Sequence, residues 1–498
     1  MNKNRISSFL NNPIFILIFL FLIFMVITYD LPLNNDEAMW SYIGRVWNEN
    51  NILPYIGTIE NKTPGIFELN AISYSLFGVN VFFMRTLGLL SILLTTLTIY
   101  YLGKKLHSKL AGIFGMYIFG LTFTWIFLGG TFISCTETFM VFFSTLSFCF
   151  ILKSKYSNKW KYLITLAGIS MGISIAFKQI ALTTTIALIF YYWFETSSNT
   201  NKKNKIIGLV LLSFGILLST FVSITPLLLQ KVSLNDYFNG AWLILLNSAS
   251  SSTMLNRISG FFSNWLFSRI VIFYPFLFLI LFQRNLLNKR YFICLLTWLL
   301  FDFIGVNSSG YFYGHQIKQL LPSLSIIVGI TLSEILTNIK NVKSEFKFNQ
   351  NVSILILIII IVFFPDKYTL KEAYQRFAKQ QENTNEEIGI WLRENSKKTD
   401  KVYILGTSGN PILFYTERVS SSKYFNSIFI SSNKERDIVY AELKANPPLF
   451  ILKPDASIEI EPKLGKDIEN YIANNYNYKE RKYNYHIFMR NKLSNHSN

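Results

Sequence analysis

The chain has 498 residues, of which 51% are hydrophobic and only 15% are charged. Soluble domains usually carry about 25% charged residues, so this composition excludes an ordinary soluble protein once its apolar residues are found in long runs. The net charge of +18 does not indicate nucleic-acid binding, because the basic residues lie in short clusters between those runs, as they do in membrane proteins.

Eleven apolar segments are long enough to be considered as spans, which need about 20 residues each and tolerate shorter ones when buried. The first follows Lys3 and Arg5 in the manner of a signal peptide, but no small-residue cleavage site comes after it, so we interpret it as a retained span. The spans are expected near residues 14–32, 82–102, 110–128, 136–152, 162–177, 179–194, 206–229, 268–283, 291–306, 320–337 and 352–364.

The loops alternate in basic content, which predicts the orientation. Isolated cations such as Lys62 and Lys178 lie in one set of loops, and clusters of Lys and Arg lie in the other. The positive-inside rule assigns the clustered set to the cytoplasm. This set comprises residues 1–13, 103–109, 153–161, 195–205, 284–290 and 338–351. We therefore expect a multi-pass protein of the inner or plasma membrane, with a cytoplasmic N-terminus and long extracytoplasmic loops at 33–81 and 230–267.

The C-terminal part differs in composition and predicts a separate domain. Residues 385–395 are amphipathic, short β-type runs follow at 401–405 and 449–452, and a Tyr-rich run covers 476–488. Alternating helices and strands are typical of an α/β domain. We expect a polytopic α-helical membrane domain over residues 1–365 and a soluble extracytoplasmic α/β domain over 366–498. The cysteines (Cys135, Cys149 and Cys294) fall in or beside apolar runs and imply no disulfide framework.

The first long loop opens with Asp36 and Glu37, directly after Asn35. Asn35 is a suitable N-cap, and apolar residues then recur at helical spacing, which predicts a helix lying along the membrane surface. The two acids occupy its first turn. Two interpretations remain open. The acids only interact with the helix dipole, which stabilises the helix by about a few tenths of a kcal/mol, or one of them is a catalytic carboxylate.

The same loop continues with Glu60, Asn61, Lys62 and then Pro64-Gly65. Pro64 suits the first position of a second helix, so Lys62 stands just ahead of a helix N-terminus. A lysine at such a place makes a site for a phosphate or another anion. The alternative is a lysine that extends its side chain to the membrane surface.

Further ionisable residues lie in or beside the predicted spans and near their outer ends. A charge inside a membrane costs about 2.5–3.5 kcal/mol when it is deep, so each of these residues needs a partner or a function. Two explanations fit a group of charged residues at one face of the membrane: the residues form structural ion pairs, or they bind an ionic substrate. The group consists of Arg85, Glu137, Arg269, Asp302, His315 and Lys318.

The order of these motifs resembles the C-type (GT-C) glycosyltransferases, which use a polyprenyl-phosphate sugar, and in particular the protein mannosyltransferase and aminoarabinose lipid A transferase group. The resemblance covers roughly the first 230 residues and rests on Asp36-Glu37, Lys62-Thr63-Pro64-Gly65, Phe77-Gly78 and Arg85. Later residues resemble the family more loosely, including Gly310 to His315, Gln319 to Pro322 and a soluble tail.

The resemblance implies a role for each of these residues. Asp36 matches the family's catalytic or acceptor-positioning acid with Glu37 beside it, and Glu137 matches a second acid. Lys62 matches the lysine that binds donor phosphate, although Asn61 stands where some relatives have an acid and Glu60 lies one residue earlier. Donor-phosphate contacts are expected from Lys62, Arg85, Arg257, Arg269, His315 and Lys318, with Pro64 and Gly65 shaping the motif.

The implied reaction is an inverting transfer of a hexosyl or pentosyl group from the lipid phosphate to an acceptor hydroxyl on lipid A, a glycan or a protein. Cations stabilise the departing phosphate, and a carboxylate accepts the hydroxyl proton. No cofactor is implied with certainty. The carboxylates could hold a divalent metal, but His occurs only 4 times and no ligand spacing requires one.

Other functions fit parts of the same pattern. A transporter or flippase of a lipid-linked or anionic substrate would place charges near the bilayer midplane and use broken helices, whereas here the charges collect at span ends. A polysaccharide polymerase or ligase would carry a different motif set. A catalytically inactive relative with a scaffolding function would not need Asp36 and Lys62.

Overall fold

The fold was obtained as a computed structural model, and the chain forms two compact units. The first comprises residues 1–31, 82–225 and 245–380, and the second comprises residues 32–81, 226–244 and 381–498. The structure describes residues 15, 31–123, 134–195, 201–246, 253–266, 277–278, 280, 283–308, 310, 313–342, 383–430, 432–455 and 461–491.

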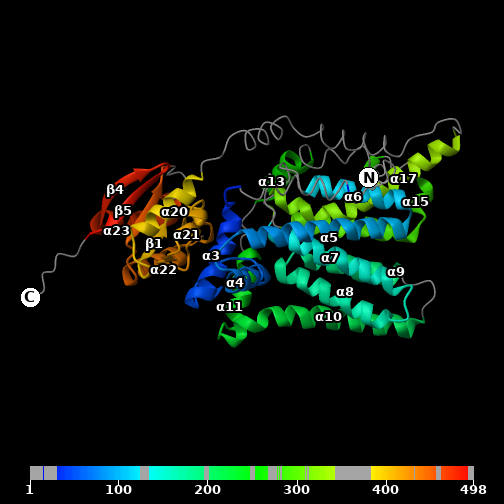
Figure 1. The fold of residues 1–498 in the computed structure, drawn as a ribbon, viewed down its shortest axis with the longest axis horizontal. Helices are drawn as coiled ribbons and strands as arrows, with labels where there is room; N and C mark the ends of the chain where they lie inside the picture. Colours follow the sequence, from blue (N-terminus) through cyan, green and yellow to red (C-terminus); the bar gives the residue numbers. More distant parts are fainter. Residues whose placement is uncertain are drawn as a thin grey trace, which may run out of the picture. The chain divides into compact units, whose positions relative to one another are not determined.

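The first unit is helical throughout its described residues (Figure 1). Long apolar segments form helices because each backbone N–H and C=O is then paired within its own segment, which a lipid environment requires. The helices are α5 (Phe82–Leu106), α6 (Lys109–Phe123), α7 (Thr136–Ser154), α8 (Trp160–Phe177), α9 (Ala181–Glu195), α10 (Lys202–Leu229), α13 (Met254–Gly260), η4 (Phe261–Leu266), α15 (Arg284–Leu287), α16 (Arg290–Asn307), η6 (Gly314–Leu320) and α17 (Leu321–Val342). The last four residues of α10, from Pro226, belong to the second unit.

The described residues include six helices that are long and apolar enough to cross a membrane. They are α5, α7, α8, α10, α16 and the continuous stretch Gly314–Asn338. The expected spans near 110–128 and 179–194 correspond to the shorter helices α6 and α9. The expected span at 352–364 and most of those at 14–32 and 268–283 lie outside the described residues, so the polytopic helical class is confirmed whereas the number eleven is not.

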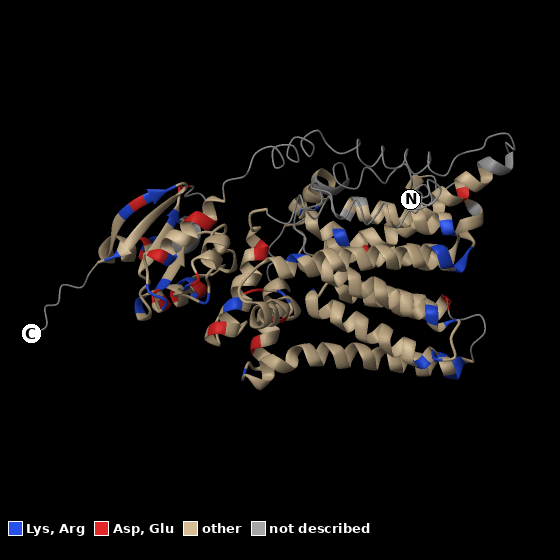
Figure 2. Cartoon of the chain, in the orientation of Figure 1, with Lys and Arg blue, Asp and Glu red and all other residues tan. Residues whose placement is uncertain are grey.

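Small residues allow the helices of this unit to approach closely. A Cβ added at Gly168 of α8 would lie 2.2 Å from the carbonyl oxygen of Leu212 in α10, and one at Gly172 would lie 2.5 Å from that of Ile216. Close packing of this kind drives helix association in a membrane, because lipid is as apolar as the side chains and burial alone gives no hydrophobic stabilisation. Lys and Arg residues gather at one end of α5, α7, α8 and α10 (Figure 2). This clustering is the pattern that the loop sequences predicted.

The second unit combines the first long loop with the tail. It comprises α3 (Asn35–Asn50), α4 (Gly65–Phe77), α11 (Leu234–Phe238), η3 (Asn239–Leu243), α20 (Thr384–Glu394), β1 (Lys401–Ile404), α21 (Asn410–Tyr415), β2 (Val419–Ser420), η7 (Ser427–Phe429), α22 (Asn433–Ala445), β3 (Phe450–Pro454), α23 (Glu461–Asn475), β4 (Tyr476–Lys482) and β5 (Tyr485–Arg490). The expected α/β tail is therefore present, and its helix and strands begin within two residues of the predicted positions.

The five strands form one sheet in the order β2-β1-β3-β5-β4. β1 pairs in parallel with β2 and β3, and β5 pairs antiparallel with β3 and β4. Successive residues point to opposite faces. Tyr403 and Ile451 pack with α22 and α23 through Val439 and Ile468 on one face. On the other, Phe450 meets Trp391 of α20 at a ring distance of 5.5 Å.

The helix α3 is joined to the tail by a fully buried arginine. The guanidinium of Arg45 donates to the carbonyl oxygens of Arg418 at 3.0 Å and Leu413 at 3.4 Å, and it pairs with Glu49 at 3.4 Å. Farther back along the helix, the hydroxyl of Tyr42 accepts from the N–H of Ser420 at 2.9 Å. Helix α3 therefore packs on the tail as part of one body.

The two helices of the first long loop begin one residue away from their expected caps. Asn34 is the N-cap of α3, and its side chain accepts from the N–H of Asp36 at 3.0 Å; the expectation of Asn35 in this role was wrong. Asn35 has a different partner in the tail, which draws its side chain away from the helix end. Pro64 is likewise the N-cap of α4, with helical φ and ψ, rather than its first residue.

Helices α3 and α4 depend on a glycine contact that a substitution would test. A Cβ at Gly44 would lie 2.5 Å from Cβ of Asn70, so Gly44→Ala must push the two helices apart. Overpacking costs about 1–3 kcal/mol, which exceeds the helix-propensity gain of about 1 kcal/mol. We expect a lower Tm for the purified full-length protein, whereas Asn48→Ala on the exposed face of α3 should leave it unchanged. An unchanged Tm in Gly44→Ala would contradict this packing.

Candidate functional site

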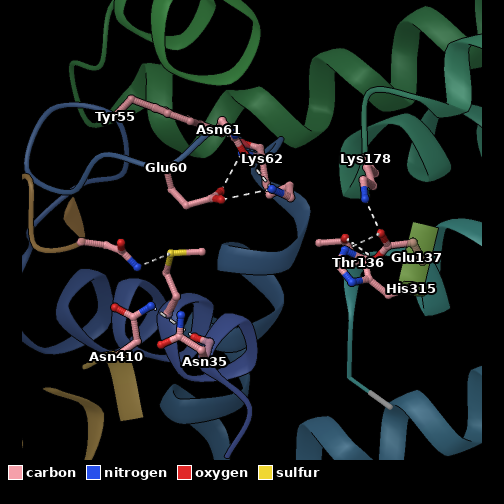
Figure 3. A network of polar contacts seen from close by, with 12 residues as sticks. Asn35, Tyr55, Glu60, Asn61, Lys62, Thr136, Glu137, Lys178, His315 and Asn410 are labelled. Atoms are coloured by element: carbon pink, nitrogen blue, oxygen red, sulfur yellow. Dashed lines mark hydrogen bonds and ion pairs between the residues drawn. The ribbon is translucent and has the colours of Figure 1, made fainter. Parts of the chain in front are cut away.

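Lys62 is held in a fixed position ahead of α4. Its ammonium donates to Oδ1 of Asn61 at 2.6 Å and to Oε1 of Glu60 at 3.2 Å, while its main-chain N–H donates to the other carboxylate oxygen of Glu60 at 2.6 Å (Figure 3). Glu60 is only 1% exposed, and the Lys62 side chain is 20% exposed. The hydroxyl of Tyr55 donates to the carbonyl oxygen of Lys62 at 2.7 Å. The ammonium is thus oriented beside the N-terminus of α4 while remaining partly accessible.

Both residues before Lys62 contribute to this arrangement. Some relatives suggested by the sequence carry an acid directly before the lysine, where this chain has Asn61. Here the amide oxygen of Asn61 and the carboxylate of Glu60 both accept from the ammonium. Glu60, although it lies two residues before Lys62 rather than one, therefore still contacts the lysine, because the chain turns between them.

Asp36 and Glu37 occupy the first turn of α3. Asp36 is partly exposed and Glu37 is buried, at 5% exposure. A carboxylate in a first turn is stabilised by the positive end of the helix dipole. Of the two adjacent acids, Asp36 is the one that can meet a molecule arriving from solvent.

Helices α3 and α4 pack antiparallel, which separates Asp36 from Lys62 along the pair. Gly44 faces Asn70, whereas Leu33 and Ala38 share an apolar cluster with Tyr74. The first turn of α3 therefore lies toward the end of α4. Between Gly65 and Tyr74, α4 extends about 14 Å at 1.5 Å per residue. Asp36 and Lys62 hence lie toward opposite ends of this helix pair rather than in direct contact.

A third carboxyl group, Glu68, lies one turn into α4. One of its side-chain oxygens, Oε1, is buried without a hydrogen-bond partner. Burial raises the pKa of the Glu68 carboxyl to about 8. Its charge in turn helps to raise the pKa of Tyr55, after the larger effect of burial, so the two groups are close. No sequence pattern indicated this residue, because a single Glu in a predicted helix is usually a solvent-exposed position.

A separate buried network forms in the first unit around Glu137, at the start of α7. Its carboxylate, which is fully buried, makes a salt bridge with Lys178, accepts from Thr136 at 3.0 Å and lies 3.6 Å from Nε2 of His315 (Figure 3). Lys178 lies in the turn between α8 and α9, and His315 lies in η6. Three segments far apart in sequence thus meet at one carboxylate.

The other predicted cations of this unit have varied partners. Lys318 is fully buried and donates to Sγ of Cys135 at 3.4 Å. Arg85 is 5% exposed and donates to the carbonyl oxygen of Leu31 at 2.8 Å. Arg257 packs its guanidinium against Gly310, whose added Cβ would lie 3.2 Å away. Arg269 lies outside the described residues.

Asp302 of α16 is satisfied by neutral partners rather than by a cation. It accepts from the hydroxyl of Thr184 at 2.5 Å and from the amide of Gln319 at 3.2 Å. The amide of Gln319 also reaches the hydroxyl of Thr184 at 3.0 Å. This network links α9, α16 and η6, which indicates a structural function for Asp302.

Metal binding is not supported by any arrangement in the described part of the chain. Within those residues, His, Cys, Asp and Glu side chains do not gather in groups of three or more that could hold an ion. The carboxylates named above lie beside lysines, hydroxyls and amides instead.

The raised pKa of Glu68 predicts a pH dependence of stability. The ordinary pKa is 4.5 and the folded value is about 8, so the folded protein holds a proton that the unfolded chain releases across this range. The contribution of protonated Glu68 to the free energy of unfolding is complete below pH 4.5 and is lost as the pH rises through 8. The loss amounts to at most about 1.4 kcal/mol per unit of difference between the two pKa values. We expect the Tm of Glu68→Gln to exceed that of the wild type increasingly from pH 5 to pH 9.

Thermal unfolding across this range, with Asn48→Ala as control, measures the effect. The control should follow the wild-type profile at each pH. A difference between Glu68→Gln and the wild type that stays constant with pH would show that Glu68 is not the group responsible.

The salt bridge between Lys178 and Glu137 predicts strong coupling. Lys178→Met leaves a buried carboxylate without its cation, which costs about 3–5 kcal/mol. Adding Glu137→Gln removes the stranded charge, so the double variant should be more stable than Lys178→Met alone. A double-mutant cycle of Tm values checks this, and additive losses would contradict the pairing.

Comparison with known proteins is consistent with this architecture. Residues 61–224 match the family model described as dolichyl-phosphate-mannose-protein mannosyltransferase. That segment contains Lys62, Arg85, Glu137 and Lys178. No curated protein sequence matches the chain.

Three solved structures share the fold. ArnT from Cupriavidus metallidurans bound to undecaprenyl phosphate aligns with a TM-score of 0.61 and 12% identity, covering 95% of this chain and 97% of that one. The Archaeoglobus fulgidus oligosaccharyltransferase tethered to an acceptor peptide aligns with a TM-score of 0.59 and 12% identity, covering 96% and 74%. AglB from the same organism, in complex with an inhibitory peptide and a dolichol-phosphate, gives a TM-score of 0.54 and 10% identity over 96% and 75%. The chain therefore has the fold of the C-type glycosyltransferases, with a C-terminal α/β tail.

Proposed function

We propose that this membrane protein is a glycosyltransferase that moves a sugar from a polyprenyl-phosphate donor to an acceptor hydroxyl on the extracytoplasmic side of the cell membrane. The transferred group is a hexosyl or pentosyl unit, and the acceptor is lipid A, a glycan or a protein. The proposal rests chiefly on Lys62, oriented by Glu60 and Asn61 beside the N-terminus of α4. The fold and the family model over residues 61–224 support it.

The chemistry requires stabilisation of the departing lipid phosphate. Negative charge grows on its oxygens as the bond to the sugar breaks, and preorganised donors aimed at that charge lower the barrier most. Lys62 supplies a positive charge, and α4 supplies the N–H groups of its first turn. Because Glu60 fixes both the main chain and the ammonium of Lys62, little reorganisation is needed when the phosphate arrives.

The acceptor hydroxyl loses its proton as it attacks the anomeric carbon, and Asp36 is the base that we assign. A direct displacement places the leaving phosphate and the attacking oxygen on opposite faces of that carbon, so Asp36 and Lys62 need not touch each other but must both reach the same donor molecule. Glu137 is less suited, because its carboxylate is fully buried and already paired with Lys178. Inversion at the anomeric carbon follows from a single displacement.

The remaining cations are assigned to the donor side. Arg85, Arg257, Arg269, His315 and Lys318 are proposed to hold the lipid phosphate or to balance its charge. Lys178 forms a salt bridge with Glu137, and His315 lies beside the same carboxylate. The polyprenyl chain would lie among the apolar helices, which is the physical reason for building this enzyme into a membrane.

Purified full-length protein incubated with a panel of polyprenyl-phosphate sugars tests the proposal. We expect the wild type to release polyprenyl phosphate from at least one donor when lipid A, an oligosaccharide or a Ser/Thr peptide is present. Asp36→Asn should lower kcat by about 10²-fold or more with donor affinity retained. Lys62→Ala should weaken both donor binding and turnover, by about 10²–10³-fold in turnover.

Two matched variants control for general damage. Asp236→Asn removes another first-turn aspartate of the same unit, in α11, and Lys231→Ala removes a nearby exposed lysine. Both should retain wild-type turnover. A wild-type protein that leaves every donor intact yet moves a lipid or solute across vesicles would replace the enzyme with a transporter.

A further inference from the structure

The first turn of α3 is bonded to a loop of the tail. The side-chain amide of Asn35 donates to the carbonyl oxygen of Thr407 at 2.7 Å, and the amide of Asn410 donates to the main-chain carbonyl of Asn35 at 3.3 Å (Figure 3). The residue directly before Asp36 is therefore held through both its side chain and its main chain. Both partners, Thr407 and Asn410, lie in the tail, more than 370 residues from Asn35 in sequence.

The loop that makes these bonds, residues 405–410, connects β1 to α21. Gly406 has φ of +96°, which a residue with a side chain rarely adopts. A Cβ at Gly409 would lie 2.3 Å from Cγ2 of Ile404. The two glycines let the chain turn sharply at the end of the strand, so the carbonyl of Thr407 faces α3 instead of continuing the sheet.

The sheet topology explains why this loop is a point of contact. β1 connects through α21 to β2 on one side, and β2 connects through α22 back to β3 on the other side of β1. The carboxyl ends of β1 and β3 thus form a topological switch point, where open parallel sheets leave a crevice for a ligand. In this chain the beginning of α3 lies at that position, through Asn35.

A second amide reinforces the same carbonyl. Asn426 is 2% exposed and donates to the carbonyl oxygen of Thr407 at 3.3 Å and to Sδ of Met39 at 3.9 Å. Asn410 is also 2% exposed. Buried amides keep their orientation because an unsatisfied polar group would cost about 1–3 kcal/mol. The tail therefore presents a rigid set of polar groups to the first turn of α3.

We propose that the β1–α21 loop of the tail, acting through Asn35 and Asn410, is a positioning element for the carboxylate of Asp36. The inference rests on the proposed function, in which Asp36 is the base. It assigns the tail to the catalytic step, beyond any contact that the tail makes with an acceptor. Asn35 and Asn410 are positioning residues, since neither is required to touch the substrate.

Variants at these two residues of the full-length protein test the proposal. Asn35→Ala and Asn410→Ala should raise amide hydrogen exchange in the peptide covering the first turn of α3. On the polyprenyl-phosphate sugar that the wild type uses, kcat should fall about 10-fold or more, with KM for the donor and Kd for polyprenyl phosphate changed less than about 2-fold. Asn410→Ser keeps a donor hydroxyl and should recover part of the loss.

The matched control is Tyr42→Phe. It removes a hydrogen bond between α3 and the tail at Ser420, about two turns away from Asp36. Its kcat should stay within about 2-fold of the wild type even if its Tm falls. A loss of kcat equal to that of Asn410→Ala would mean that any loosening of the tail lowers activity, which overturns the specific role of the loop.

The remaining outcomes separate the two proposals. Unchanged exchange in the first turn of α3, or faster exchange with unchanged kcat, overturns the positioning role while the transferase stands. A wild-type protein that releases no polyprenyl phosphate from any donor overturns the proposed function itself, and the assignment of Asp36 falls with it.

Discussion

The position of α3 depends on the buried guanidinium of Arg45. A buried charged group is costly unless it is paired and hydrogen-bonded, and the terminal nitrogens of Arg45 pair with Glu49 and donate to two carbonyl oxygens of the tail, at Leu413 and Arg418. Separating α3 from the tail would strand that charge. The helix that begins with Asp36 is consequently fixed by the same interaction that fixes the tail, and the loop and tail form one compact unit.

Several buried charged groups among the described residues of both units have a partner close by. Glu137 is paired with Lys178 and approached by His315, and Glu60 is paired with Lys62. Asp302 has hydroxyl and amide partners instead. The exposure of the pairs differs, because Lys62 is partly accessible whereas Glu137 is fully buried. Of the two pairs, the one that contains Lys62 is therefore the one that an anion from solvent can reach.

The contact between the loop after β1 and Asn35 suggests what the tail does in this protein. In an α/β sheet, the loops after parallel strands usually receive a ligand, because strand ends leave backbone groups without partners. Here the loop after β1 receives Asn35, so its polar groups are used to fix a helix. Thr407 and Asn410 are thus the tail residues that contact the first turn of α3 through Asn35.

The sequence by itself determined the helical membrane class, the α/β tail and the lysine motif. Long apolar runs allow hardly any other structure in lipid, and Pro64-Gly65 following Lys62 marks a helix start by local chemistry alone. These features depend on residues that are neighbours in the chain, so the sequence pattern is sufficient to predict them. The segments at 110–128 and 179–194 were likewise recognised, and the helices α6 and α9 lie within or close to them.

Only the tertiary structure decided which distant residues meet. Lys178 was counted in the sequence as a loop cation, and the fold brings it to Glu137 across 41 residues. Asn35 was expected to cap its own helix, but the tail supplies a carbonyl to its amide, and Asn34 takes the cap. The raised pKa of Glu68 depends on what buries it. Such pairings arise from packing between segments far apart in the chain, and a single sequence carries no local pattern that specifies them.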